Sequence, residues 1–231
     1  YIDGKKIGRQ ESLCTPHIYD LNEYIGTGIH EMTICVSNVG YKTKGGHLTS
    51  PDTQTNWNGI TGRIELIGYK NAHAENVMLW CDIHNKTVRV TANITGEKSG
   101  KAVISAESFN SEKNHTPAVQ SFEYTNGKLD ALYKMGDDCL LWSEHEPNLY
   151  KLRIDIDGDV SEHIIGMREF KTEGGKFTIN GEKTFLRGKH DGMIFPKTAF
   201  APTDLDEWLR VMKISKSYGM NHYLYLSLIH I

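Results

Sequence analysis

The chain between about residues 69 and 171 is a series of short apolar or alternating segments separated by turn residues. These segments are residues 77–80, 87–94, 102–105, 118–124 and 149–156. Alternation with a period of two is typical of strands that bury one face, and Asn126-Gly127 and Asp157-Gly158 are strong signals for tight hairpin turns. About seven short strands within roughly 100 residues predict an immunoglobulin-like β-sandwich over this region.

Composition excludes two classes of partner. The chain has 26 basic and 29 acidic residues, a net charge of −3, so it lacks the basic excess of a nucleic-acid-binding protein. Its longest apolar runs are about five residues, far below the roughly 18–20 that a membrane helix needs. Four cysteines without metal-ligand spacing favour buried free thiols, and no metal or cofactor is expected.

The N-terminal part carries weaker strand signals. Asp3-Gly4 predicts a hairpin turn, and residues 31–38 and 64–67 are candidate strands. Residues 40–62 between them form a long polar loop, and a loop of that length in a compact domain is usually functional or disordered. The two tryptophans Trp80 and Trp142 are expected in the sandwich core.

The pattern changes at residue 177. Residues 177–179 and 183–187 flank Asn180-Gly181, which predicts a hairpin whose second strand ends at Arg187.

A helix and a further strand follow. Thr203 or Asp204 is the predicted cap of this helix, and Gly219 its stop. Its apolar stripe, with approximate helical spacing, consists of Leu205, Trp208, Leu209, Met212 and Ile214. A strand from His222 completes a strand–helix–strand unit, and Trp208 is expected to pack between helix and strand.

Four segments, in a consistent order, resemble glycoside hydrolase family 2, the group that contains β-galactosidases, β-glucuronidases and β-mannosidases. They are residues 57–64 (WNGITGRI), 141–150 (LWSEHEPNLY), 165–188, with the sequences IGMRE, FTING and FLRG, and 216–223 (KSYGMNHY). The resemblance covers nearly the whole chain and implies a mostly β, multi-domain protein.

The resemblance also divides the chain. Residues 1–69 are expected to be the end of a jelly-roll sugar-binding domain, and residues 70–171 an immunoglobulin-like β-sandwich. Residues 172–225 would begin an incomplete (β/α)8 TIM barrel. Residues 226–231 match the in-frame translation of a transposase adapter used in sequencing libraries, so they are interpreted as an artificial tail on a metagenomic fragment truncated at both ends.

The implied activity is that of an exo-acting retaining β-glycosidase that hydrolyses terminal sugars of β-linked oligosaccharides. In this family both catalytic glutamates lie on later barrel strands, beyond residue 231. No catalytic residue is therefore nominated here, and the fragment alone is predicted to be inactive. The alternative is a non-catalytic carbohydrate-binding or adhesion protein. Composition fits it equally well up to Lys171, whereas the strand–helix–strand unit argues against it.

Five residues are candidates for substrate binding. His190 and Asp191 follow the predicted first barrel strand, and His222 lies at the second, where barrel active sites form. The structural alternative for His190 and Asp191 is an ordinary surface loop, and for His222 a packed histidine. Lys189 is expected to be solvated. Asn56 and Trp57 belong to a loop that relatives extend toward the sugar, although packing between domains is the favoured explanation for Trp57 and Asn56 is divided between the two roles.

Several properties stay open at this point. The sugar, its linkage and the compartment are not determined, with a bacterial periplasmic or secreted location slightly favoured over the cytoplasm. The partner implied by the resemblance is a carbohydrate substrate. The resemblance is also compatible with a homo-oligomeric full-length protein.

Overall fold

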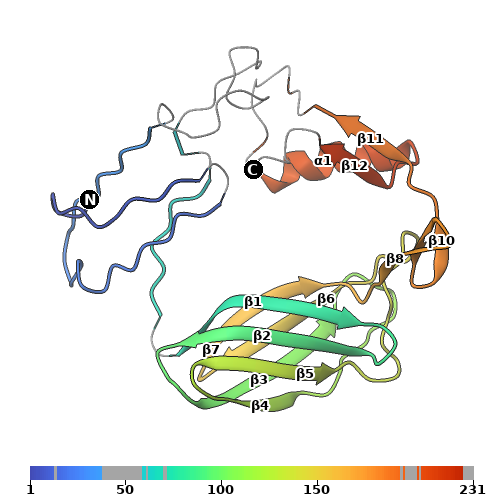
Figure 1. The fold of residues 1–231 in the computed structure, drawn as a ribbon, viewed down its shortest axis with the longest axis horizontal. Helices are drawn as coiled ribbons and strands as arrows, with labels where there is room; N and C mark the ends of the chain where they lie inside the picture. Colours follow the sequence, from blue (N-terminus) through green and yellow to red (C-terminus); the bar gives the residue numbers. More distant parts are fainter. Residues whose placement is uncertain are drawn as a thin grey trace. The chain divides into compact units, whose positions relative to one another are not determined.

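The computed structural model describes residues 1–12, 15–37, 59–60, 62–69, 72–192, 195, 202 and 204–225. Within these residues the protein is mostly β with a single helix (Figure 1). The chain divides into two compact units, one formed by Leu66–Phe185 and the other by Tyr1–Glu65 together with Leu186–Ile231. The predicted domain boundaries remain predictions.

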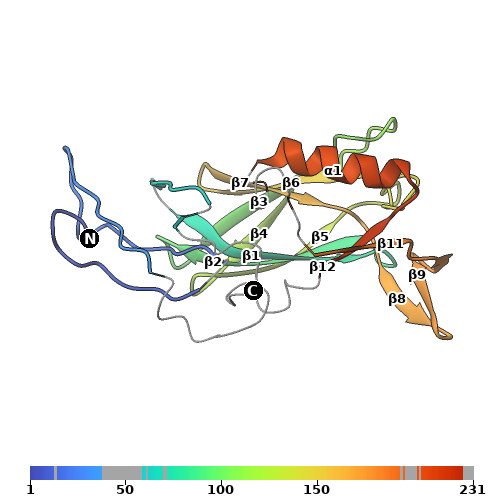
Figure 2. The same cartoon turned by 90° about the horizontal axis from the view of Figure 1, so that it is seen from above.

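Seven short antiparallel strands of the first unit form two sheets that lie face to face (Figures 1 and 2). One sheet has the order β1-β2-β5, with β1 His73–Asp82, β2 Thr87–Thr95 and β5 Lys128–Lys134. The other has the order β4-β3-β6-β7, with β3 Gly100–Ser108, β4 Gln120–Tyr124, β6 Tyr150–Ile156 and β7 Asp159–Ile165. The strands predicted from alternation are confirmed.

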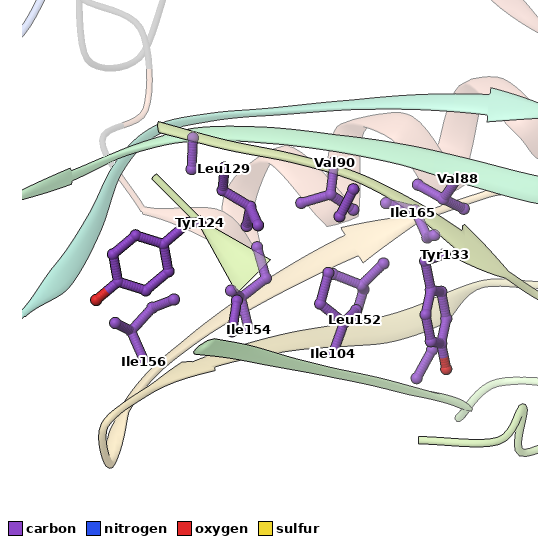
Figure 3. Close-up of a cluster of buried hydrophobic side chains, with 14 of the residues drawn as sticks. Val88, Val90, Ile104, Tyr124, Leu129, Tyr133, Leu152, Ile154, Ile156 and Ile165 are labelled. Carbon is purple, nitrogen blue, oxygen red and sulfur yellow. The ribbon is translucent and has the colours of Figure 1, made fainter. Parts of the chain in front are cut away.

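The core lies between the two sheets because alternate residues of each strand point inward. In β6, Leu152 and Ile154 are fully buried and the residues between them are only partly buried. Figure 3 shows these side chains meeting Val88 and Val90 from β2 and Tyr133 from β5. Burial of this continuous apolar layer is the main term that stabilises the unit.

Hairpin turns connect neighbouring strands as the sequence predicts. Asn126 and Gly127 have φ of 54° and 66°, and Asp157 and Gly158 have φ of 53° and 85°. Two successive residues with positive φ form the turn type that matches the twist of an antiparallel pair.

The side chain of Gln120 connects the edges of the two sheets. Its Nε2 donates to the carbonyl of Lys134 at 2.8 Å, and its Oε1 accepts from the amide of Lys134 at 3.1 Å. Gln120 belongs to β4 and Lys134 to β5, which are edge strands of different sheets. One side-chain amide therefore occupies both backbone groups of Lys134.

A small sheet of order β10-β9-β8 extends from the sandwich (Figure 2). It contains β8 Phe170–Glu173, β9 Lys176–Ile179 and β10 Glu182–Thr184. Asn180, at φ 53°, begins the predicted turn. Its Oδ1 accepts from the amide of Glu169 at 2.9 Å and its Nδ2 donates to the carbonyl of Trp142 at 2.9 Å. Asn180 thus fastens the hairpin to two segments of the sandwich unit.

Trp80 corrects one expectation about the core. Its side chain is 46% exposed on the outer face of β1, where the guanidinium of Arg89 lies 5.8 Å from the ring. The neighbours Val77, Leu79 and Cys81 are the ones that pack on the core. The run of five apolar residues has no periodicity, so the sequence alone could not tell which residues point inward.

The N-terminal segment forms the Asp3-Gly4 turn but not the predicted strands. Ile2 bridges Lys5 and Met32, and Asp3 accepts from His30 and from the amide of Glu31 at 2.7 and 2.8 Å. Residues 31–37 and 64–67 are exposed and in no strand. An alternating pattern forms a strand only where a neighbour pairs with its backbone. Among the described residues, this pairing is limited to Glu31 and Thr33, which bond Asp3 and Tyr1 on either side of the bridge at Met32.

Three elements of the second unit form the predicted strand–helix–strand sequence: β11 Gly188–Asp191, α1 Leu205–Ser217 and β12 His222–Tyr225. The carboxylate of Asp204 accepts from the amide of Glu207 at 2.8 Å, which confirms the predicted cap. Gly219, at φ 79°, follows the helix end as predicted.

No helix in the described parts of the chain has the length and hydrophobicity needed to cross a membrane. Cys35, Cys81 and Cys139 are free thiols, as expected, but Cys35 is exposed rather than buried. Cys14 lies outside the described residues.

Candidate functional site

Three of the five predicted substrate-binding residues, His190, Asp191 and His222, lie on a pair of parallel strands, β11 and β12, which are joined through α1 (Figure 1). In the register of this pair Gly188 lies beside His222, and Asp191 beside Tyr225. The sequence predicted a strand that ends at Arg187. In the structure the hairpin strand β10 ends at Thr184 and a separate strand, β11, begins at Gly188, so His190 and Asp191 are strand residues.

Hydrogen bonds between Arg187 and Asn221 explain why β11 begins at Gly188. The amide of Arg187 donates to Oδ1 of Asn221 at 2.8 Å, and the amide of Asn221 donates to the carbonyl of Arg187 at 3.1 Å. The guanidinium of Arg187 donates to the carbonyl of Gly219. These bonds hold Arg187 on the turn before β12, so that regular pairing starts one residue later on each strand.

The pair has two faces because successive side chains of a strand point to opposite sides. Tyr223 and Tyr225 lie on the face covered by α1, since the hydroxyl of Tyr223 bonds that of Ser215 and the ring of Tyr225 lies 6.3 Å from that of Trp208, at nearly a right angle. Trp208 thus packs between helix and strand as expected. Lys189 and Asp191, the partners of the two tyrosines in the register, share this face.

A close ion pair lies on the helix-covered face. Nζ of Lys189 is 2.7 Å from Oδ2 of Asp191, whose side chain is 15% exposed, and 5.3 Å from the centre of the Tyr223 ring. The hydrogen bond to Asp191 raises the pKa of Lys189. Burial raises the pKa of Tyr225, and the charge of Asp191 adds to this effect. Lys189, expected to be solvated, is therefore part of the site's scaffold.

The sequence carried a signal for this pair that was missed. Lys189 and Asp191 are two residues apart on a strand, and such residues always share a face. Tyr223 and Ser215 were missed because a hydroxyl bond between a helix and a strand leaves no pattern in the sequence.

The opposite face carries His190, His222 and Leu224. Leu224 is 50% exposed and His190 is exposed, so this face is open within its unit. Nδ1 of His222 is buried and has no hydrogen-bond partner among the described residues. Imidazoles supply one donor and one acceptor each when neutral, which suits hydroxyl groups of a ligand.

Asn56 and Trp57 lie outside the described residues, so the structure does not place these two candidates relative to the strand pair. His190, Asp191 and His222 are brought together, but Asp191 lies on the opposite face from the two histidines. Sugar binding by any of the five stays a prediction. Within the described residues, no three His, Cys, Asp or Glu side chains gather in a way that could hold a metal ion.

Replacing Gly188 by alanine tests the contact between the strands. An added Cβ would lie 2.4 Å from Nδ1 of His222, so the ring must move. We expect a loss of about 1–3 kcal/mol in the stability of the strand pair, as for other overpacked sites. Amide hydrogen exchange of Lys189 and Tyr223 measures this loss. The double variant with His222→Ala should recover most of it; no recovery would contradict the contact.

Comparison with known proteins gives the family context of these two units. Residues 72–168, which include the whole two-sheet sandwich, match the family Glycosyl hydrolases family 2. A β-galactosidase of Leuconostoc mesenteroides is 23% identical over 92% of this chain, and one of Halalkalibacterium halodurans is 24% identical over 96%. Each match covers 22% of the relative, so this chain spans about a fifth of the length of these β-galactosidases.

Solved structures show the same fold. A GH2 β-galacturonidase from Eisenbergiella tayi, bound to galacturonate, aligns with 98% of this chain and 41% of its own, with a TM-score of 0.66 and 18% identity. A β-glucuronidase from Faecalibacterium prausnitzii aligns with 66% of this chain and 24% of its own, with a TM-score of 0.51 and 17% identity.

Proposed function

Because this chain belongs to glycosyl hydrolase family 2, we propose that it is a segment of an exo-acting, retaining β-glycosidase that removes terminal sugars from β-linked oligosaccharides. The match of residues 72–168 to the family is the observation that carries this proposal. The parallel pair β11–β12 with its connecting helix supports it, since this unit follows the sandwich in the order that the family resemblance implies.

The proposal assigns a part to each region. Residues 1–69 are the end of a jelly-roll domain, and residues 70–171 an immunoglobulin-like domain, supported by seven antiparallel strands in two facing sheets. Residues 172–225 begin a (β/α)8 barrel, supported by the strand–helix–strand unit. Residues 226–231 are an artificial tail on a metagenomic fragment.

The catalytic step needs two carboxyl groups, about 5–5.5 Å apart in a retaining enzyme, one as nucleophile and one as acid and base. We place both on later barrel strands of the parent protein, as the family resemblance implies. Two carboxylates near the barrel start already have structural partners: Asp191 pairs with Lys189, and Glu169 pairs with Lys171 at 2.7 Å. The 231-residue chain is therefore expected to bind without hydrolysing.

Substrate contact is assigned to the open face of the strand pair. His190 and His222 would exchange hydrogen bonds with sugar hydroxyls, and the exposed side chain of His190 is accessible for this role. Asp191, the last residue of β11, would hold the strand end through Lys189 and reach the sugar from there. Asn56 and Trp57 would contribute the amide and the aromatic ring of the N-terminal loop.

A non-catalytic carbohydrate-binding protein is the second candidate, and the two-sheet unit taken alone fits it. The parallel strand pair favours the glycosidase over the binding protein. A helix that connects two parallel strands is typical of α/β folds and is not an element of antiparallel sandwiches.

Expression of the longer reading frame tests the proposal. We expect hydrolysis of an aryl β-glycoside from a panel that includes galactoside, glucoside, mannoside, glucuronide and galacturonide, with retention at the anomeric carbon by NMR. The 231-residue chain is the matched control and should show no turnover. Hydrolysis by this control, inversion of the product, or a longer frame that contains only further sandwiches would each contradict the proposal.

A further inference from the structure

The two-sheet sandwich has a cleft at one end, between the segment before β4 and the segment after β5. Its volume is about 580 Å³, and residues 115–118, Gln120 and 134–138 line it. All of these residues belong to the unit Leu66–Phe185, and none belongs to the strand pair β11–β12. The cleft is open to solvent, since most of its lining residues, Thr116, Ala118, Lys134 and 136–138, are exposed.

A buried tyrosine holds His115 at the wall of this cleft. Tyr150, fully buried, has its hydroxyl 2.7 Å from Nδ1 of His115 and accepts from the amide of Leu140 at 2.8 Å. The hydroxyl also contacts Sγ of Cys139, at 4.0 Å, and because Nδ1 is the nearer and stronger acceptor we assign the hydroxyl proton to Nδ1. Nδ1 is therefore the acceptor, and the proton of the neutral ring is on Nε2.

This second nitrogen borders the cleft. Nε2 of His115 would lie 3.9 Å from a Cβ added at Gly136, which also lines the cleft and has φ of 83°. Within the part of the chain that the structure describes, Nε2 makes no hydrogen bond. Burial lowers the pKa of His115, and the nearby charge of Asp138 opposes this shift. The ring thus presents one fixed N–H donor.

The other groups of the cleft complement this donor. Asp137 and Asp138 supply carboxylate acceptors, each able to bind two hydroxyl protons, and Lys134 supplies a further donor. Pro117 and Ala118 add apolar surface. Nζ of Lys86 also donates to the carbonyl of Asp137, so two ammonium groups lie near the two carboxylates of the cleft.

We propose that this cleft is a binding site for a neutral pyranose, with Nε2–H of His115 donating to one sugar hydroxyl and the carboxylate of Asp138 accepting from the adjacent ones. The site goes beyond the proposed function because it shares no residue with the strand pair that carries His190 and His222. It rests on the proposed function in one respect, which is that sugars are taken as the class of ligand.

Titration of the isotope-labelled 231-residue chain with methyl β-galactopyranoside, followed by NMR, tests this site. We expect saturable shifts at residues 115, 136 and 138 with a millimolar Kd. His115→Asn keeps an oxygen near the position of Nδ1 for Tyr150 but lacks the atom at Nε2, so it should weaken binding at least about tenfold. Asp138→Asn, on an exposed residue, should weaken it similarly without affecting folding.

Glu123→Gln is the matched control, because Glu123 is an exposed carboxylate of β4 outside the cleft, and it should bind as the unchanged chain does. Absence of saturable shifts, unchanged affinity in both cleft variants, or equal shifts with glycerol would overturn the proposal. Hydrolysis is not measured here, so failure of this site and failure of the glycosidase proposal are distinguishable.

Discussion

Replacing Leu152 by alanine should lower the free energy of unfolding by about 2–5 kcal/mol. Leu152 is fully buried in β6, at the centre of the layer between the two sheets (Figure 3). The substitution removes apolar contacts and leaves a cavity that neighbouring strands cannot close, because the ladders on both sides of β6 hold them in register. Urea unfolding followed by circular dichroism measures the change.

Leu132→Ala is the matched control for this substitution. Leu132 is in β5 of the opposite sheet, but its side chain points outward and is 54% exposed. The same chemical change should cost less than about 1 kcal/mol there, since little surface leaves water on folding. Equal losses in the two variants would mean that the layer between the sheets is not the core of this unit.

Replacing Asn180 by alanine should destabilise the small sheet β8–β9–β10 by about 1–3 kcal/mol. The change removes the bonds to the amide of Glu169 and the carbonyl of Trp142, and it places an alanine at φ 53°, where a side chain that cannot bond locally is disfavoured. Amide exchange at Glu169 and at Thr178 would report the loss.

Asn180→Gly separates the two causes. Glycine accepts a positive φ without strain, so this variant loses the side-chain bonds alone and should be intermediate between the alanine variant and the unchanged chain. If the glycine variant protects the amide of Glu169 as well as asparagine does, then the two side-chain bonds do not fasten the hairpin to the sandwich.

The sandwich strands and the helix could be predicted because local rules and tertiary packing agree there. In β6 the period of two in the sequence is also the period of burial. In α1 the capping role of Asp204 depends on a residue three positions away, so it is a local property. Such elements can be predicted from the local sequence without knowing which distant residues they contact.

Other elements depend on partners that the sequence does not identify. Residues 31–37 have the alternation of a strand but, among the described residues, their backbone pairs only over Glu31–Thr33, around the bridge at Met32. The start of β11 is set by Arg187 bonding Asn221, which is 34 positions away. Local alternation cannot predict either outcome, because both depend on contacts distant in sequence.

The sequence placed His190 and Asp191 in a loop after a strand, whereas both are residues of β11, and it did not divide the candidate residues between two faces. His190 and Asp191 are adjacent in sequence, and for that reason they point to opposite sides of β11. The carboxylate of Asp191 is held by Lys189, a residue that the sequence suggested was solvated. Whether a residue lies in a loop or in a strand decides which face its side chain occupies. The bounds of β11 depend on contacts with residues distant in the sequence, so they could not be predicted locally.

The amide of Gln120 has a consequence for how this protein behaves at high concentration. A sheet edge with free N–H and C=O groups is a template on which a strand from another molecule can assemble. At Lys134 both groups are already engaged within the same chain. This position of the β5 edge is consequently closed to intermolecular pairing, so Gln120 protects the sandwich against edge-to-edge aggregation.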